Sequence, residues 1–304
     1  MGNLREIKSR IKTVGNTAKI TRTMELIATA KSQVCVKRIK NALPYFHALS
    51  DIASQARRAG ADDDGAGLHP LLEEREVKRV AVLIVVANRG FCGGYNGNCL
   101  RMGRDRRQAL LDEGKEVDLY ISGKKGISWL KFQHLDWVGD GYTAFEDKPR
   151  YEDVEGVADT LITSFLSGGV DRVEVVYTHY LSAGRQEAST ETLLPITPPV
   201  EDKADKADKA DKAGKAEINV DFIIEPDPAS ILDTLFPLQA KLHLYRVYLE
   251  AATSEQLARM IAMKNATENA SDMCQTLKMA YNRARQTQIT NEILEVIGGA
   301  EALA

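Results

Sequence analysis

Two glycine-rich stretches are the parts of this chain whose residue types and spacing best suit chemistry. Positions 88–97 read Asn-Arg-Gly-Phe-Cys-Gly-Gly-Tyr-Asn-Gly, and positions 123–126 read Gly-Lys-Lys-Gly. A glycine-rich turn that leads into a helix can hold a phosphate on its backbone amides. Neither stretch matches the dinucleotide-binding or P-loop spacing. The simpler interpretation is a tight turn that needs glycine at positive φ, so we expect no nucleotide and no other cofactor.

The cysteines and histidines do not form a catalytic or metal-binding pattern. The four cysteines contain no CxxC pair, and the five histidines are scattered along the chain: Cys35, Cys92, Cys99 and Cys274; His47, His69, His134, His179 and His243. Spacing of this kind predicts no metal site. We expect reduced thiols, structural or solvated histidines, and no catalytic residue.

The C-terminal region instead carries many amide, hydroxyl and guanidinium groups in a helical pattern. Glu and Lys are better helix formers than Asn and Thr, so these positions need another reason. One interpretation is a polar face in water. The other is a set of hydrogen bonds to a partner that surrounds the helix, because neutral bonds of roughly 0.5–1.5 kcal/mol net suit a contact made and broken repeatedly. The residues are Arg259, Asn265, Thr267, Asn269, Asn282, Arg285, Gln286, Gln288, Thr290 and Asn291.

Two long helices must position these side chains. Residues 1–43 predict one helix, which could continue beyond Pro44 as far as residue 58. Residues 228–303 predict another helix, and Gly298-Gly299 is its expected stop signal. At about 1.5 Å per residue they measure about 65 and 110 Å, too long for the inside of a globule. Spacings of three and four predict an antiparallel coiled coil outside the globular part. The apolar positions are Leu4, Ile7, Ile11, Val14, Ile20, Met24, Ile27 and Val34 in the first helix, and Ile231, Leu235, Leu238, Leu242, Tyr245, Leu249, Leu257, Ile261, Met273, Leu277, Ile289, Ile293 and Val296 in the last.

The middle of the chain predicts a separate open α/β domain of Rossmann-like type. Strands are expected at 77–86, 117–121, 173–180 and 188–194, with helices at 96–113, from 125, and at 154–166. The Asp-Lys-Ala repeat within 201–216 has no apolar face and predicts a solvated linker. The expected organisation is therefore a shaft helix at 1–58, a linker at 59–76, the α/β domain at 77–198, a low-complexity linker at 199–224 and a second shaft helix at 225–304.

Charge and hydropathy narrow the classes of function. Residues 1–41 hold ten Lys/Arg but only Glu6 and Glu25 as acids, which keeps open a coiled coil that binds nucleic acid. No aromatic residue precedes Tyr45, whereas single-strand binding usually uses stacked aromatics. A third class is an α/β enzyme with coiled-coil arms, which would show turnover alone. The longest apolar run, Val80 to Ala87, is far short of the roughly 20 residues that span a bilayer.

Six stretches together resemble the gamma-subunit family of the F-type ATP synthases, at both ends and in the middle and in the same order. They are Leu4-Arg-Glu-Ile-Lys-Ser-Arg-Ile, Lys19-Ile-Thr-Arg-Thr-Met-Glu-Leu-Ile-Ala-Thr-Ala-Lys31, Arg89-Gly-Phe-Cys-Gly-Gly-Tyr-Asn96, Glu225-Pro-Asp-Pro228, Ser254-Glu-Gln-Leu-Ala-Arg-Met-Ile-Ala-Met-Lys264 and Tyr281-Asn-Arg-Ala-Arg-Gln-Thr-Gln-Ile-Thr-Asn-Glu292. Two departures fall near the glycine-rich turn, where the family often has Ser-Asp for Ala87-Asn88 and Leu for Phe91. The paired-cysteine insert of the chloroplast form is absent, which favours a bacterial type.

The resemblance implies a central rotor shaft without catalysis of its own, in a proton-transporting ATP synthase. The shaft couples proton flow through the membrane sector to ATP synthesis in the ring of α and β subunits. Its other implied partners are the epsilon subunit and the membrane c-ring, with no nucleic acid, and its implied place is the cytoplasmic side of the inner membrane, as a peripheral protein. Matching the family motifs residue by residue implies that Met24, Arg259, Gln286 and Thr290 contact the ring.

Overall fold

The computed structural model describes residues 2–61, 69–145, 148–196 and 228–301. They form two compact units. The helical unit contains residues 1–30, 91–93 and 257–304, and the sheet unit contains residues 31–90 and 94–256. The predicted linker at 199–224 and most of the predicted loop at 59–67 lie outside the described residues.

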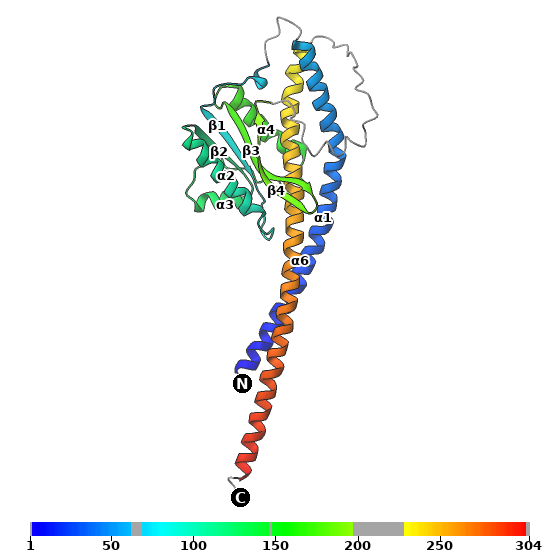
Figure 1. Cartoon of the computed structure of the whole chain (residues 1–304), viewed down its shortest axis with the longest axis vertical. Coiled ribbons are helices and arrows are strands. Elements are labelled where there is room, and N and C mark those ends of the chain that lie inside the picture. Colours follow the sequence, from blue (N-terminus) through cyan, green and yellow to red (C-terminus); the bar gives the residue numbers. More distant parts are fainter. Residues whose placement is uncertain (1, 62–68, 146–147, 197–227, 302–304) are drawn as a thin grey trace. The chain divides into compact units, whose positions relative to one another are not determined.

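The sheet unit is built on four strands that closely match the predicted ones. They are β1 (Arg79–Val85), β2 (Glu116–Ser122), β3 (Arg172–Ser182) and β4 (Arg185–Leu194), in the order β2-β1-β3-β4. β1 is parallel to β2 and β3, and β4 is antiparallel to β3. The sheet is therefore mixed, and β4 is an edge strand (Figure 1).

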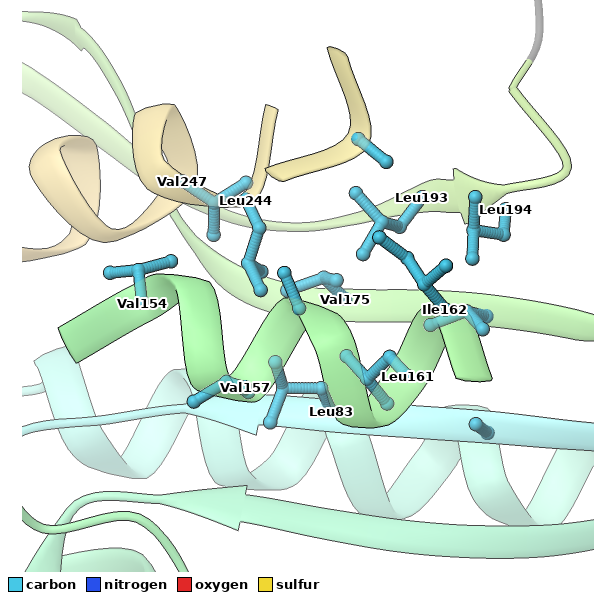
Figure 2. Packing of buried hydrophobic residues seen from close by; sticks show 14 of the residues in the cluster. Leu83, Val154, Val157, Leu161, Ile162, Val175, Leu193, Leu194, Leu244 and Val247 are labelled. Atoms are coloured by element: carbon cyan, nitrogen blue, oxygen red, sulfur yellow. The ribbon is translucent and has the colours of Figure 1, made fainter. Parts of the chain in front are cut away.

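Both faces of this sheet are covered by helices, as the continuous apolar run of β1 predicts. Val80, Val82 and Ile84 pack on one face with residues of α2 (Tyr95–Asp112) and α3 (Lys124–Phe132). The alternate residues of β1, including Leu83, pack on the other face with α4 (Tyr151–Leu166). Figure 2 shows this second cluster, with Val157 and Leu161 of α4 facing Leu83.

Part of the long C-terminal helix α6 (Pro228–Glu301) also belongs to this core. Its residues Phe236, Ala240, Leu244, Val247 and Ala251 are buried in the same cluster as α4, and Figure 2 places Leu244 and Val247 above β3 and α4. The prediction that the long helices stay outside the globular part is therefore wrong for this stretch. Bulky apolar residues on a second face of the helix, beside the predicted coiled-coil positions, draw it onto the sheet.

In the helical unit, the N-terminal helix α1 (Gly2–Ala61) and α6 run antiparallel. The Thr267 hydroxyl donates a hydrogen bond to the Thr21 hydroxyl (2.9 Å), while the Cys274 thiol lies 3.5 Å from the carbonyl oxygen of Ile11. Residues earlier in α1 therefore lie opposite residues later in α6. This arrangement confirms the predicted antiparallel helix pair.

The buried face of α1 differs from the predicted one. Its inward positions follow a seven-residue repeat through Val14, Thr21, Ala28 and Cys35. The predicted positions Ile20, Ile27 and Val34 lie one residue earlier and are exposed by 60, 50 and 43 %. The prediction is wrong at these three positions, because it followed the large apolar side chains there and not the smaller residues one position later. The predicted positions that are half-buried are Leu4, Ile7, Ile11, Val14 and Met24.

Both helices also continue past their predicted breaks. α1 includes Pro44, which is exposed, so the carbonyl that loses its helical partner there is on the solvent side. α6 includes Gly298 and Gly299 and ends at Glu301. A single helix breaker in a long helix is outweighed by the hydrogen bonds on both sides of it.

Candidate partner-binding surface

The C-terminal end of α6 extends beyond the start of α1 (Figure 1). Cys274 is opposite Ile11, and the two helices rise equally per residue, so Gly2 is opposite about residue 283. The rest of α6, to Glu301, has no part of α1 beside it. We call residues 284–301 the C-terminal tip.

Large apolar side chains are exposed along this tip. Every residue from 291 to 298 is exposed, and five aliphatic residues have exposed fractions of 46–73 %: Ile289, Ile293, Leu294, Val296 and Ile297. Water-exposed aliphatic groups at this density mark a surface that another molecule covers. The prediction that Ile289, Ile293 and Val296 continue the coiled coil is wrong, because none of the described residues forms a second helix there.

Two of the four predicted ring contacts lie on the same tip. Gln286 and Thr290 are exposed and one turn apart, and the Thr290 hydroxyl donates to the carbonyl oxygen of Gln286 (3.0 Å). The hydroxyl oxygen can still accept a hydrogen bond, and the Gln286 amide is turned to solvent. The tip therefore combines apolar area with neutral hydrogen-bonding groups.

Met24 lies in a second exposed apolar region, on α1. It is half-buried, and its neighbours Ile20, Leu26 and Ile27 are exposed by 60, 56 and 50 %. Ile20, Leu26 and Ile27 point away from the buried repeat that faces α6, whereas Met24, three residues after Thr21 and four before Ala28, lies beside that repeat. We call this group the N-terminal apolar surface.

Arg259 differs from the other three predicted contacts, because its side chain is buried, with 8 % of the residue exposed. It also lies far from Gln286. The 27 residues between them along α6 correspond to about 40 Å. The structure therefore does not bring the four predicted residues into one site, and a partner that touched all of them would extend along much of the helical unit.

The glycine-rich turns are occupied by the chain's own hydrogen bonds. At the start of α3 the amide of Lys124 donates to the Asn88 side chain (2.9 Å) and the amide of Lys125 donates to the carbonyl oxygen of Ala87 (3.2 Å). Gly93 and Gly123 adopt positive φ, of 57° and 109°. A nearby cavity, lined by Tyr95 among others, has a volume of about 30 Å³, enough for water but not for a nucleotide. The geometry agrees with tight turns.

Two observations in the described part of the chain bear on the predicted lack of a metal site and of reactive thiols. Burial raises the pKa of the Cys99 thiol to about 12, so it stays protonated. The described residues contain no group of three or more His, Cys, Asp or Glu arranged to hold a metal ion. Among the helices described, none has a stretch long and apolar enough to cross a bilayer.

A polar cluster that we did not predict joins β3, β4 and α6. It consists of Tyr177 and His179 on β3, Glu191 on β4, and His243, Arg246 and Glu250 on α6. The positions on α6 are three, four and seven apart, which places them on one helical face, and those on β3 are two apart, on one strand face. Those spacings were visible in the sequence, but nothing in the sequence indicated that the two faces meet.

Comparison with known proteins gives one consistent family. The family model described as ATP synthase matches residues 3–303. The ATP synthase gamma chain of Rhodopirellula baltica is 43 % identical over 304 residues, covering 100 % of this chain and 99 % of the relative. That of Leptospira biflexa is 37 % identical over 306 residues, with full coverage of both chains.

Solved structures have the same fold. A chain of the Euglena gracilis mitochondrial ATP synthase, in the OSCP/F1/c-ring assembly in rotational state 3, aligns with a TM-score of 0.65 at 21 % identity. The alignment covers 99 % of this chain and 95 % of that one. A chain of the rotor of the same enzyme, in rotational state 1, aligns with a TM-score of 0.60 at 19 % identity, covering 95 % of this chain and 99 % of that one.

Proposed function

We infer the function of this chain from its family, because the chain belongs to the ATP synthase gamma chains. It is the central rotor shaft of an F-type ATP synthase and couples proton flow through the membrane sector to ATP synthesis. It is a non-catalytic subunit of that complex. Its partners are the α and β subunits of the catalytic ring, the epsilon subunit and the membrane c-ring.

The observation that carries this function beyond the family name is the unpaired C-terminal tip. An apolar helix end of this kind exposes hydrocarbon to water, which is unfavourable. A surrounding ring of subunits would cover this surface. Neutral groups such as Gln286 and Thr290 suit a contact that changes as the shaft turns, since each bond contributes only about 0.5–1.5 kcal/mol net. We propose that Met24 and Arg259 contact the ring as well.

An asymmetric shaft explains coupling as a population shift. Each catalytic site in the ring meets a different side of the shaft, so each is biased toward a different conformation. Rotation then moves each site through the same set of states. The division into shaft helices at 1–58 and 225–304 around an α/β domain at 77–198 is part of this proposal, as is a peripheral location on the cytoplasmic side of the cell inner membrane.

The test is co-purification of the affinity-tagged full chain from its own cells. We expect the α and β subunits in equal numbers, with epsilon and the c-ring retained in mild detergent. Recovery of the tagged chain without ring subunits would contradict the proposal. Steeply salt-dependent binding to DNA or RNA by that ring-free chain would instead support a nucleic-acid-binding coiled coil, through the basic residues of α1.

The purified chain alone should not hydrolyse ATP. It has no P-loop, with its Lys and Ser/Thr, to hold the phosphates and the magnesium ion. Phosphate release by the chain alone should equal that of a buffer blank. ATP hydrolysis should be measurable once α and β subunits are added. ATP hydrolysis by the chain after removal of all ring subunits would instead favour an α/β enzyme with coiled-coil arms.

A further inference from the structure

The polar cluster of the sheet unit connects the β3–β4 hairpin to α6 through two carboxylates. Glu191 on β4 accepts hydrogen bonds from Arg246 (2.8 Å) and from the Tyr177 hydroxyl (2.5 Å). Glu250 on α6 lies 2.5 Å from the Nδ1 atom of His179 on β3. All of these residues belong to the sheet unit. The cluster is thus a junction between one strand pair and one helix.

Charge balance in this junction requires a cation beside Glu250. Glu250 is only 5 % exposed, and a buried carboxylate is costly unless it is paired. Arg246 makes its short contact with Glu191, while its Nε atom is 3.8 Å from Glu250. The His243 ring also contacts Glu191, at 3.1 Å, so both of these groups make their short contacts with Glu191 and not with Glu250. The group in short contact with Glu250 is the His179 ring, whose side chain is 27 % exposed and can exchange a proton with water.

We propose that His179 is positively charged in the folded protein and fastens the β3–β4 hairpin to α6, so that loss of its proton loosens this junction. The proposal does not depend on the rotary function. It assigns a pH-responsive contact to a residue outside the glycine-rich turns and outside both apolar surfaces.

The surrounding charges support this assignment. The hydrogen bond to Glu250 raises the pKa of His179 above 6.5, against desolvation by burial, and the charge of Glu191 adds to the rise while that of Arg246 opposes it. Burial disfavours the charged form of Glu191. Hydrogen bonds from His243 and Tyr177, together with the charge of Arg246, outweigh this effect and lower the pKa of Glu191 to about 2. Glu191 is therefore an anion at every physiological pH.

Glu187, the residue of β4 nearest to His179 in the strand ladder, contributes little to the charge state of His179. Glu187 on β4 is directly opposite His179 in the strand ladder, but it pairs with Arg185 at 3.0 Å and is exposed. An exposed pair of this kind is screened by water and salt. The carboxylate that decides the charge of His179 is thus Glu250.

The sign of the pH effect follows from the raised pKa. A histidine whose pKa is higher in the folded state adds stability that is fully present below 6.5, its pKa in the unfolded chain. That contribution is lost as pH rises through the folded-state pKa. The junction should therefore be tight below pH 6.5 and looser at pH values above the folded-state pKa of His179.

The direct test is an NMR titration of the imidazole signals of the full-length wild-type chain. The His179 signal is assigned by its disappearance in His179→Gln. We expect its midpoint to lie above 6.5, and to fall when Glu250 is replaced by Gln. A midpoint at or below 6.5 in the wild type would overturn the proposal, and this measurement needs no variant of Glu250 that folds.

Unfolding by denaturant at several pH values tests the consequence. The matched control is His47→Gln, because His47 is an exposed histidine on α1. We expect His179→Gln to lower the folding equilibrium constant several-fold relative to wild type at about pH 6, with most of this deficit gone at a pH about two units above the midpoint of the NMR titration. His47→Gln should show no pH-dependent deficit. An equal deficit for His179→Gln at both pH values would mean that a neutral imidazole makes the contact, and would contradict the proposal.

Discussion

Replacing Gly123 by Ala is expected to destabilise the sheet unit by about 3–5 kcal/mol. Gly123 is the N-cap residue just before α3 and has φ of 109°, a conformation that residues with a Cβ rarely adopt. A Cβ there would lie 2.1 Å from the carbonyl oxygen of Val86. That atom belongs to the backbone at the end of β1, so it cannot move aside as a flexible side chain could. Relief would require α3 to shift off the sheet edge.

The measurement is denaturant unfolding of the full chain, followed by tryptophan fluorescence. The two tryptophans, Trp129 in α3 and Trp137 just after it, report on the region that the substitution disturbs. The matched control is Gly156→Ala in α4, where a Cβ meets nothing within 4 Å. This control should be neutral or more stable by up to about 1 kcal/mol, because Ala is the better helix former. Equal stability of the two variants would contradict the argument.

Replacing Arg259 and Gln286 together by Ala is expected to lower proton-driven ATP synthesis about tenfold or more. A lost charge-assisted contact costs about 1.5–3 kcal/mol, and each 1.4 kcal/mol corresponds to a factor of ten. Such a loss is large enough to shift the conformers of the ring that the shaft selects. The assay is ATP synthesis in membrane vesicles whose content of the mutant subunit equals that of wild type.

The two single variants separate folding from partner contact. Arg259 is buried, so Arg259→Ala also removes buried contacts within the chain, and circular dichroism and unfolding of the isolated chain will measure that effect. Gln286 is exposed, so Gln286→Ala should leave both unchanged and still reduce synthesis. Gln275→Ala is the matched control, because Gln275 is exposed on the same helix but has no family match to a ring contact. Full synthesis by the double variant would show that these residues only form a solvated face.

The sequence by itself determined the secondary structure and the family. The apolar run of β1 predicted a strand buried on both faces, and the three-and-four spacing of α6 predicted a long helix, because each pattern reflects local geometry. The terminal motifs placed the chain among the gamma subunits. They also identified Gln286 and Thr290, which the structure leaves exposed on the C-terminal tip.

Only the tertiary structure decided which faces of the helices meet. Local spacing could not tell that Thr21 and Ala28 are buried while Ile20 and Ile27 face outward, because both sets repeat every seven residues. It could not tell that α6 enters the core of the sheet unit, or that His179 and Glu250, which are 71 residues apart, share a hydrogen bond. Periodicity gives the angle of a side chain around its own helix or strand. The partner of that face is set by packing between distant segments, and no local pattern records it.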